Sequence, residues 1–420
     1  MTTSPSPTED TVLTPQLCTQ GRERAQPVID WLFAMRLQPS RISQLFEGFL
    51  RELDAVGIPV DRSTLHLPQL HPQLRARTVL WEDGEQAVVE IPRVHGIEHT
   101  EFFLKSPIKQ VFDGGPAVRR RLGQPGCPLD FPITEELHGN GYRDYTVRPL
   151  PFSNGQVNGL TLSSKQDGGF SDCDIATVEA TLPAFGLLLE LRHAYVTAQT
   201  LMETYLGTRS GQRVLAGTIR RGHAERINAV LLTSDLRCFT ELSESLTMEE
   251  VVDLLDEYFE IMGVAIVESG GEILKFIGDG ILAIFPTGEA GEAATCSACE
   301  AAMQAARRAL QGIHNKRLHR ESLGLVPYRA GIALHLGDVL YGNIGAADRL
   351  DFTVIGPAVN LVSRIEALNQ ALHLPLVFSA DFAASWKGAA RSLGLHQLKG
   401  IADPQEVFTL ADTAGLPGQD

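Results

Sequence analysis

The chain has 420 residues, which is more than one ordinary hydrophobic core accommodates, so two domains and connecting segments are expected. Apolar residues make up 44% and charged residues 21%, and no run is long enough to cross a bilayer, which favours a soluble protein over a membrane protein. The net charge of −15 disfavours nucleic acids and anionic lipid surfaces as partners. Small nucleotides are not excluded, because they carry divalent cations that acidic residues can hold.

The N-terminal segment, residues 1–25, is polar and offers little apolar surface, so we expect it to be disordered. It lacks the basic and apolar regions of a secretory signal. The six cysteines are scattered without the spacing of a disulfide framework. Together these features predict a cytoplasmic protein.

A first domain is expected over residues 26–190. Residues 27–53 show the spacing of two amphipathic helices that are separated at Pro39 and Ser40. The pattern then predicts a hairpin over residues 78–81 and 86–91, a helix over 106–122 with a Gly-Gly-Pro interruption, strands over 145–152 and 159–164, and an exit helix over 175–198. Ser171 or Asp172 is the expected N-cap of that last helix.

This order of central strands closed by a long helix resembles the small sensory domains of the GAF type. Residues 168–174, with the sequence GGFSDCD, are similar to the FSDxD phrase at the entry to the last GAF helix. The resemblance implies an α/β regulatory domain that binds a small molecule, and the residues do not identify this ligand. Residues 191–225 then predict a helical linker that turns rich in glycine and arginine at 207–211.

The C-terminal part alternates strands and helices in the order β-α-β-β-α-β. The predicted elements are a strand over 227–234, a helix over 248–268, a hairpin over 272–277 and 281–285, a helix over 293–310, strands over 328–335, 339–343 and 352–355, and a helix over 358–372. This order predicts an α+β domain of the ferredoxin-like plan, with an antiparallel sheet and helices on one face.

Two carboxylates in this part are expected to lie together. Asp279 stands in the Asp-Gly turn of the hairpin, and Asp235 ends the first strand, which lies beside the hairpin in this plan. Two hard oxygen donors at one edge of a sheet suit Mg²⁺ or Mn²⁺, completed by substrate phosphates and water. Paired metals of this kind serve in-line phosphoryl or nucleotidyl transfer.

Four phrases of this part resemble the catalytic domain of class III nucleotidyl cyclases, the adenylate and guanylate cyclases. They occur in the family's order over residues 227–411, and they are 234–240 (SDLRCFT), 271–280 (GEILKFIGDG), 331–337 (GIALHLG) and 352–366 (FTVIGPAVNLVSRIE). The resemblance implies a cyclase domain over residues 226–415.

The resemblance assigns roles to seven residues. Asp235 and Asp279 match the metal-binding aspartates, which implies two Mg²⁺ or Mn²⁺ ions per active site. Lys275 and Thr353 match the base-recognition pair of the adenylyl cyclases that carry threonine in place of aspartate. Asn360 matches the residue that orients the ribose, and Arg364 matches the arginine that stabilises charge on the α-phosphate. Lys399 aligns less closely with a lysine that contacts the triphosphate.

The implied activity is that of an adenylate cyclase, a phosphorus–oxygen lyase that converts ATP to 3′,5′-cyclic AMP and pyrophosphate. Lys275 can donate to adenine N1, whereas guanine N1 carries a hydrogen and would need an acceptor. A guanylate cyclase and a catalytically silent nucleotide-binding module are the alternatives. Because the family builds its site between two catalytic domains and this chain has one complete set, the resemblance implies a homodimer.

Two departures from the family's pattern stand beside these residues. Cys238 follows Arg237 where glycine is common, and Pro357 and Ala358 stand where Asp-Thr is common. Neither change removes a catalytic group, but Pro357 lies close to Thr353 in sequence and could affect base selectivity.

Overall fold

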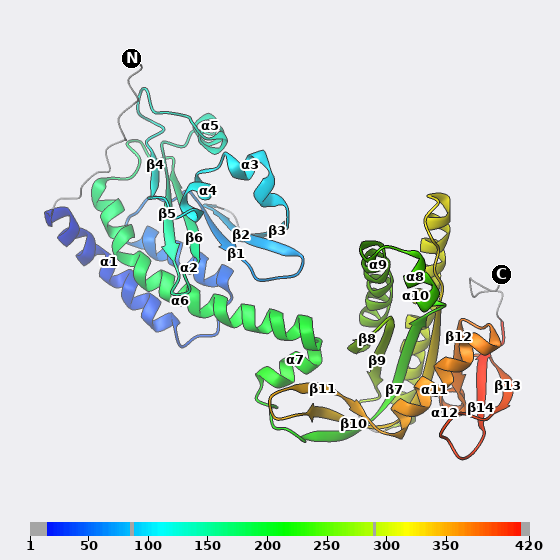
Figure 1. The fold of residues 1–420 in the computed structure, drawn as a ribbon. Coiled ribbons are helices and arrows are strands. Elements are labelled where there is room, and N and C mark those ends of the chain that lie inside the picture. The colour runs from blue at the N-terminus through cyan, green and yellow to red at the C-terminus, as the bar shows by residue number, and fades with distance from the viewer. Residues whose placement is uncertain (1–14, 85–87, 289–290, 413–420) are drawn as a thin grey trace. The chain divides into compact units, whose positions relative to one another are not determined.

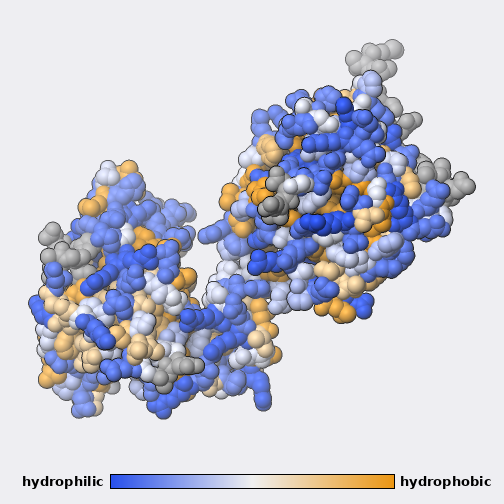
Figure 2. Space-filling model, turned by 180° about the vertical axis from the view of Figure 1, so that it is seen from behind, coloured by the Kyte–Doolittle hydropathy of each residue, from blue (hydrophilic) through white to orange (hydrophobic). Residues whose placement is uncertain are grey.

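The computed structural model describes residues 15–84, 88–288 and 291–412 (Figure 1). The chain divides into two compact units, Met1–Leu201 and Met202–Asp420. This division falls in the long helix α6 (Asp172–Leu206), within the segment predicted to join two domains. No helix in the described ranges is long and apolar enough to span a bilayer. In the view of Figure 2 the surface is mostly hydrophilic, and apolar residues form small groups on it.

The N-terminal unit is built on one antiparallel sheet whose strands follow the order β3-β2-β1-β6-β5-β4. Its strands are β1 (Arg62–Pro68), β2 (Leu74–Glu82), β3 (Val89–Val94), β4 (Val118–Arg120), β5 (Asp144–Pro151) and β6 (Val157–Ser164). Alternate residues of β1 face opposite sides of this sheet. Leu65 and Leu67 lie in the larger apolar core, and Thr64 and His66 face the other side.

Helices cover both faces of this sheet. One face carries α1 (Pro15–Met35), α2 (Ile42–Ala55) and α6, whose apolar side chains form the core with Leu65 and Leu67. The other face carries the short elements η1 (Ile97–His99), α3 (Glu101–Leu104), α4 (Pro107–Phe112) and α5 (Pro132–Gly139). Side chains of α4 and α5 form a smaller apolar cluster with β5 there.

The predicted strands over 145–152 and 159–164 are confirmed as β5 and β6. The predicted first hairpin is confirmed as β2 and β3, with β3 beginning at Val89; residues 85–87 lie outside the described ranges. Ser171 caps α6, because its Oγ accepts from the Asp174 amide at 3.1 Å and its own amide donates to the Asp174 carboxylate at 2.8 Å. The strand β1 has no counterpart among the predictions.

The helix predicted over residues 106–122 is wrong in its second half. Helix α4 ends at Phe112, and Gly114 takes a φ of 83°, which turns the chain out of the helix. Residues 118–120 then pair with β5 as strand β4. The guanidinium of Arg119 donates to the fully buried Asp144 carboxylate at 2.7 Å, so a tertiary ion pair fixes this segment in the sheet.

The disorder expected for residues 1–25 is wrong for residues 15–25, which belong to α1; residues 1–14 lie outside the described ranges. Composition alone does not reveal the tertiary contacts that hold this segment. Arg24 forms an ion pair with Asp174 of α6 at 2.5 Å, and Ala25 is fully buried. Gly21 lies so close to α6 that an added Cβ would come within 2.7 Å of the Ala176 Cβ.

The C-terminal unit contains a second sheet, in the order β13-β14-β12-β10-β7-β9-β8, with β11 paired to β10. Its strands are β7 (Ala224–Leu236), β8 (Glu272–Ile277), β9 (Gly280–Pro286), β10 (Ala330–Gly345), β11 (Leu350–Ile355), β12 (Leu376–Ser379), β13 (Ala390–His396) and β14 (Gln405–Leu410). Strands β10 and β12 are parallel, and the other pairs are antiparallel. The runs predicted over 328–335 and 339–343 are thus one long strand, β10.

The helices of this unit lie on both faces of its sheet, so the expectation of helices on one face is wrong. They are α7 (Thr208–Leu215), α8 (Phe239–Ser245), α9 (Met248–Glu268), α10 (Glu292–Ser322), α11 (Pro357–Leu372) and α12 (Ala380–Ser385). Val230 and Leu232 of β7 pack towards α9 and α10. Ala229 and Leu231 pack on the opposite face with Val362 and Ile365 of α11, which explains why this strand is apolar without alternation.

The helix predicted over residues 248–268 is confirmed as α9. Its start is set by a capping box, in which the Thr247 Oγ1 accepts from the Glu250 amide and the Thr247 amide donates to the Glu250 carboxylate at 2.8 Å. The predicted hairpin is confirmed as β8 and β9, and the last predicted helix as α11. The glycine- and arginine-rich segment 207–211 contains the N-cap residue Gly207 and the first residues of α7.

The close approach of α1 to α6 predicts that Gly21→Ala destabilises the N-terminal unit. The new methyl group would overlap Ala176, and a forced overlap of this kind costs about 1–3 kcal/mol. The measurement is the urea midpoint from tryptophan fluorescence in a Trp386→Phe background, where Trp31 and Trp81 report on this unit. Gly139→Ala is the matched control, because nothing lies within 4 Å of an added Cβ there. Equal midpoints for the two variants would contradict the docking of α1.

Candidate active site

The hairpin of β8 and β9 holds Asp279 in a two-residue turn. Ile277 pairs with Gly280, and Gly278 between them takes a φ of 64°, a left-handed value that glycine adopts without strain. Gly280 is required for a different reason, because a Cβ there would lie 3.2 Å from the Ser234 carbonyl oxygen. The backbone of the hairpin therefore approaches the end of β7 closely.

This approach brings Asp235 and Asp279 together, as the sequence predicts. Strand β7 runs antiparallel to β9 with Ser234 opposite Ile281, so Asp235 lies beside the turn. Burial raises the pKa of Asp235 to about 7, and the neighbouring Asp279, through a hydrogen bond and its charge, and the charge of Glu366 add to the shift. The two carboxylates thus repel each other and are only partly exposed.

A divalent cation fits this pair of carboxylates. No group of three histidine, cysteine or acidic side chains in the described ranges is arranged to hold a metal ion by itself. Two carboxylate donors suit Mg²⁺ or Mn²⁺, which keep several positions for water and substrate phosphates. A cation would also relieve the repulsion that raises the pKa of Asp235.

Glu366 and Arg237 are site residues that the sequence reasoning missed. Burial raises the pKa of Glu366 on α11, the charge of Arg237 opposes this shift, and the charge of Asp279 adds to it. Burial lowers the pKa of the Arg237 guanidinium, which donates to the Leu374 carbonyl at 3.1 Å. Both residues lie within the phrases that carry the cyclase resemblance, but their proximity to the aspartates becomes visible only in the fold.

The two proposed base-recognition residues come from neighbouring strands. Lys275 pairs with Leu282 after an irregularity in β8, and it is half-buried. Thr353 lies in β11, which packs against β8. The Thr353 side chain is buried, and its Oγ1 has no hydrogen-bond partner in the described part of the chain. A buried hydroxyl without a partner is costly, so this oxygen is available to a ligand.

Asn360, Arg364 and Lys399 are exposed, and none of them is among the groups that shift the pKa of Asp235. Asn360 lines a groove of 1160 Å³ together with Asn228 and Gly400. Arg364 lies one turn further along α11, and Lys399 lies in the connection between β13 and β14. Within the described ranges, no hydrogen bond or ion pair joins these three residues to the aspartate pair.

The helix α7 is anchored to β8, which carries Lys275, and to β10, which pairs with the strand of Thr353. The buried carboxylate of Glu272, the first residue of β8, accepts from the Ser210 amide at 2.8 Å, the Ser210 hydroxyl at 2.7 Å and the Tyr341 hydroxyl at 2.9 Å. Tyr341 precedes Gly342, the partner of Thr353 in the sheet. The absence of a side chain at Gly207 allows the start of α7 to pack closely on β8, because a Cβ there would lie 3.2 Å from the Ile273 carbonyl oxygen.

The two departures from the cyclase pattern have different backbone consequences. Cys238 takes a φ of 56° at the start of α8, a left-handed conformation that costs a non-glycine residue about 1–2 kcal/mol. This geometry explains a preference for glycine at the position. Pro357 is the first residue of α11, where proline is favoured because its missing amide hydrogen would have no helical partner.

Comparison with known proteins supports the resemblance. Residues 223–384 match the family model described as adenylate and guanylate cyclase catalytic domain. The chain is 38% identical over 156 residues to the adenylate cyclase of Anabaena cylindrica, a match that covers 36% of this chain and 29% of that protein. It is 28% identical over 199 residues to adenylate cyclase 1 of Rhizobium meliloti, covering 45% of this chain and 29% of that protein.

Among solved structures, the chain is similar to the guanylyl cyclase Cya2, with 30% identity and a TM-score of 0.40. This match covers 46% of the chain and 98% of that structure. The chain spans less than a third of the length of the two curated relatives. The matched segment contains Asp235, Lys275, Asp279, Thr353, Asn360 and Arg364. Residues 223–384 therefore form a domain of the adenylate and guanylate cyclase catalytic family.

Proposed function

We propose that the chain is an adenylate cyclase, which forms 3′,5′-cyclic AMP and pyrophosphate from ATP and acts as a homodimer. The observation that carries this proposal is the close approach of Asp235 and Asp279 in a cyclase catalytic domain. In the reaction the ribose 3′-oxygen bonds to the α-phosphorus and loses its proton, while the bond from the α-phosphorus to the β-phosphate bridging oxygen breaks.

Each site residue would have the role that the family resemblance implies. Lys275 donates to adenine N1, and the Thr353 hydroxyl accepts from the adenine 6-amino group. Asn360 orients the ribose, Arg364 stabilises charge on the α-phosphate, and Lys399 contacts the triphosphate. Two Mg²⁺ or Mn²⁺ ions at Asp235 and Asp279 would activate the attacking hydroxyl and neutralise the leaving pyrophosphate.

The exposure of Asn360 and Arg364 favours a site shared between two chains. No hydrogen bond or ion pair joins them to the aspartates within the described ranges, and their exposed side chains are accessible to a second chain. Two-fold symmetry would bring Asp235, Asp279, Lys275 and Thr353 of one chain opposite Asn360 and Arg364 of the other. The N-terminal unit, which we predict to be GAF-like, would regulate this pair of sites from the cytoplasm.

Cyclic nucleotide formation by the purified chain with Mn²⁺ tests the activity. We expect cyclic AMP from ATP and little cyclic GMP from GTP, and at least a thousandfold loss of cyclic AMP in Asp279→Ala, since the variant loses a metal ligand. Glu406→Ala is the matched control, because Glu406 is an acidic strand residue of the same unit that accepts from Ser392 outside the groove of Asn360. Preferred use of GTP would support the alternative that the chain is a guanylate cyclase. If neither nucleotide gives a product, the alternative of a catalytically silent nucleotide-binding module would remain.

Mixing two inactive variants tests the shared site. Asp279→Ala and Arg364→Ala break different halves of each site, so a mixed dimer keeps one intact site of two. With random exchange half of the dimers are mixed, and we expect about a quarter of the wild-type activity to return. The readout is cyclic AMP formation after co-refolding or co-expression of the two chains. Activity that stays at the level of the single variants would contradict a site shared between chains.

The unpartnered Thr353 hydroxyl gives a test of base recognition. Thr353→Val keeps the shape and removes a hydroxyl that has no hydrogen-bond partner among the described residues, so thermal stability should be unchanged or slightly higher. The ratio of kcat/KM for ATP over GTP should fall about tenfold, since the adenine amino group loses its acceptor.

Thr409→Val is the matched control for this substitution. Its buried Oγ1 donates to the Leu376 carbonyl oxygen at 2.8 Å, so the change should lower stability and leave the ATP/GTP ratio unchanged. A Thr353→Val variant that loses stability but keeps its ATP/GTP ratio would give Thr353 a purely structural role.

A further inference from the structure

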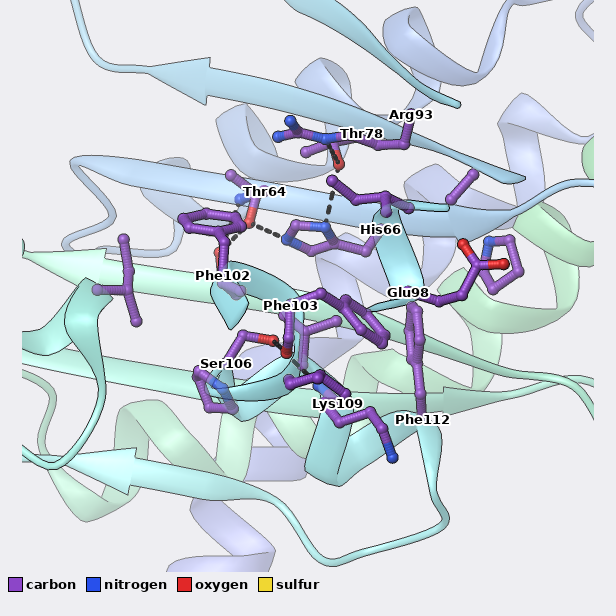
Figure 3. A pocket seen from close by; sticks show the side chains of 18 of the residues that line it. Thr64, His66, Thr78, Arg93, Glu98, Phe102, Phe103, Ser106, Lys109 and Phe112 are labelled. Atoms are coloured by element: carbon purple, nitrogen blue, oxygen red, sulfur yellow. Dashed lines mark hydrogen bonds between the residues drawn. The ribbon is translucent and has the colours of Figure 1, made fainter. Parts of the chain in front are cut away.

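The N-terminal unit contains a cavity of 590 Å³ on the face of its sheet opposite the larger core (Figure 3). Strands β1, β2, β3 and β6 form its floor, and η1, α3 and α4 form its cover. Most of the lining is apolar, and it includes Leu80, Ile91, Ile97, Phe102, Phe103 and Phe112. A cavity of this size and character matches the sites that bind small organic molecules.

A row of polar side chains crosses the floor of this cavity. Arg93 Nε donates to Thr78 Oγ1 at 3.3 Å, which lies 3.1 Å from His66 Nδ1, and His66 Nε2 lies 2.8 Å from Thr64 Oγ1 (Figure 3). Thr64 Oγ1 lies 2.5 Å from Thr161 Oγ1. These side chains come from four different strands, so the row depends on the correct pairing of the whole sheet.

The protonation state of this row follows from its donors. Burial lowers the pKa of His66 to about 3, and the positive charges of Arg93 and Arg62 add to the shift, so the imidazole is neutral. Because Thr78 already accepts from Arg93, its own proton can go to His66 Nδ1, which leaves the His66 proton on Nε2 facing Thr64. Both ring nitrogens are then used, and the imidazole keeps no free lone pair for a metal or a haem iron.

One positive charge at the cavity is unbalanced. Arg62 is paired with Glu82 at 2.9 Å, Arg75 with Glu98 at 3.8 Å, and Lys109 with Asp113. Arg93 has no carboxylate partner within the described ranges, and the hydrogen bond to Thr78 uses only its Nε. The two terminal nitrogens of its guanidinium therefore remain available at the edge of an apolar cavity.

We propose that this cavity binds a small organic anion with an apolar, ring-containing body, such as an aromatic carboxylate. The guanidinium of Arg93 would hold the anionic group in a fork of two parallel hydrogen bonds. The phenylalanine side chains above the sheet would pack against the ring, and the hydroxyls of Thr64 and Thr161, which share one hydrogen bond, have one proton left to donate to the ligand. The proposal concerns binding and does not depend on the cyclase activity.

A pair of fluorescent probes tests separately the anionic group and the apolar body of the proposed ligand. Anilinonaphthalene sulfonate carries an apolar body and a negative charge, and N-phenylnaphthylamine has the same body without the charge. We expect each probe to bind the full-length chain at one site, and Arg93→Met to weaken the sulfonate at least tenfold while the neutral probe binds unchanged. Arg77→Met is the matched control, because Arg77 lies in the same sheet, outside the cavity lining, and is paired with Glu90.

A second variant locates the probe in the cavity. Ala76 lines the cavity from β2, so Ala76→Trp should fill it and remove the binding of both probes. If this variant does not fold, the comparison of Arg93→Met with Arg77→Met still decides the role of the charge. Equal weakening of the sulfonate by both arginine variants would overturn the proposal, and so would a folded Ala76→Trp protein that binds both probes as the wild type does.

Discussion

The catalytic unit is organised around two negative charges that are held close together. Asp235 and Asp279 would separate if the backbone allowed it, since burial and mutual repulsion raise the pKa of Asp235 to about 7. The pairing of β7 with β9 prevents this separation, and the absence of a side chain at Gly280 lets the hairpin approach the end of β7. The packing of α11 adds a third acidic residue, Glu366, to the same region. The sheet thus holds the carboxylates close enough to repel each other, and a bound cation would relieve this repulsion.

Local patterns predicted much of this unit because its local and tertiary preferences agree. The capping box at Thr247 and Glu250 and the Asp-Gly turn at Asp279 act within a few residues, so helix α9 and the β8–β9 hairpin follow from the sequence alone. The position of α11 does not follow from local patterns. The continuous apolar run of β7 is typical of a strand that is buried on both faces, but it does not indicate which helix covers the second face.

The N-terminal unit was harder to predict because its decisive contacts join distant residues. The strand at residues 118–120 is held by the Arg119–Asp144 ion pair, and the helix over residues 15–25 by the Arg24–Asp174 pair and the close approach of Gly21. None of these three contacts leaves a periodic signal in the sequence. In the same way, the family resemblance pointed to seven candidate site residues, whereas the roles of Glu366 and the buried Glu272 emerge only from the arrangement of side chains in space.

The anchoring of α7 limits how a mechanical signal can enter the catalytic sheet. Releasing Ser210 would take two of its three hydrogen-bond donors from the buried Glu272 carboxylate, at a cost of about 1–3 kcal/mol or more. We therefore expect any displacement that keeps these hydrogen bonds to move α7 together with β8, the strand that carries Lys275.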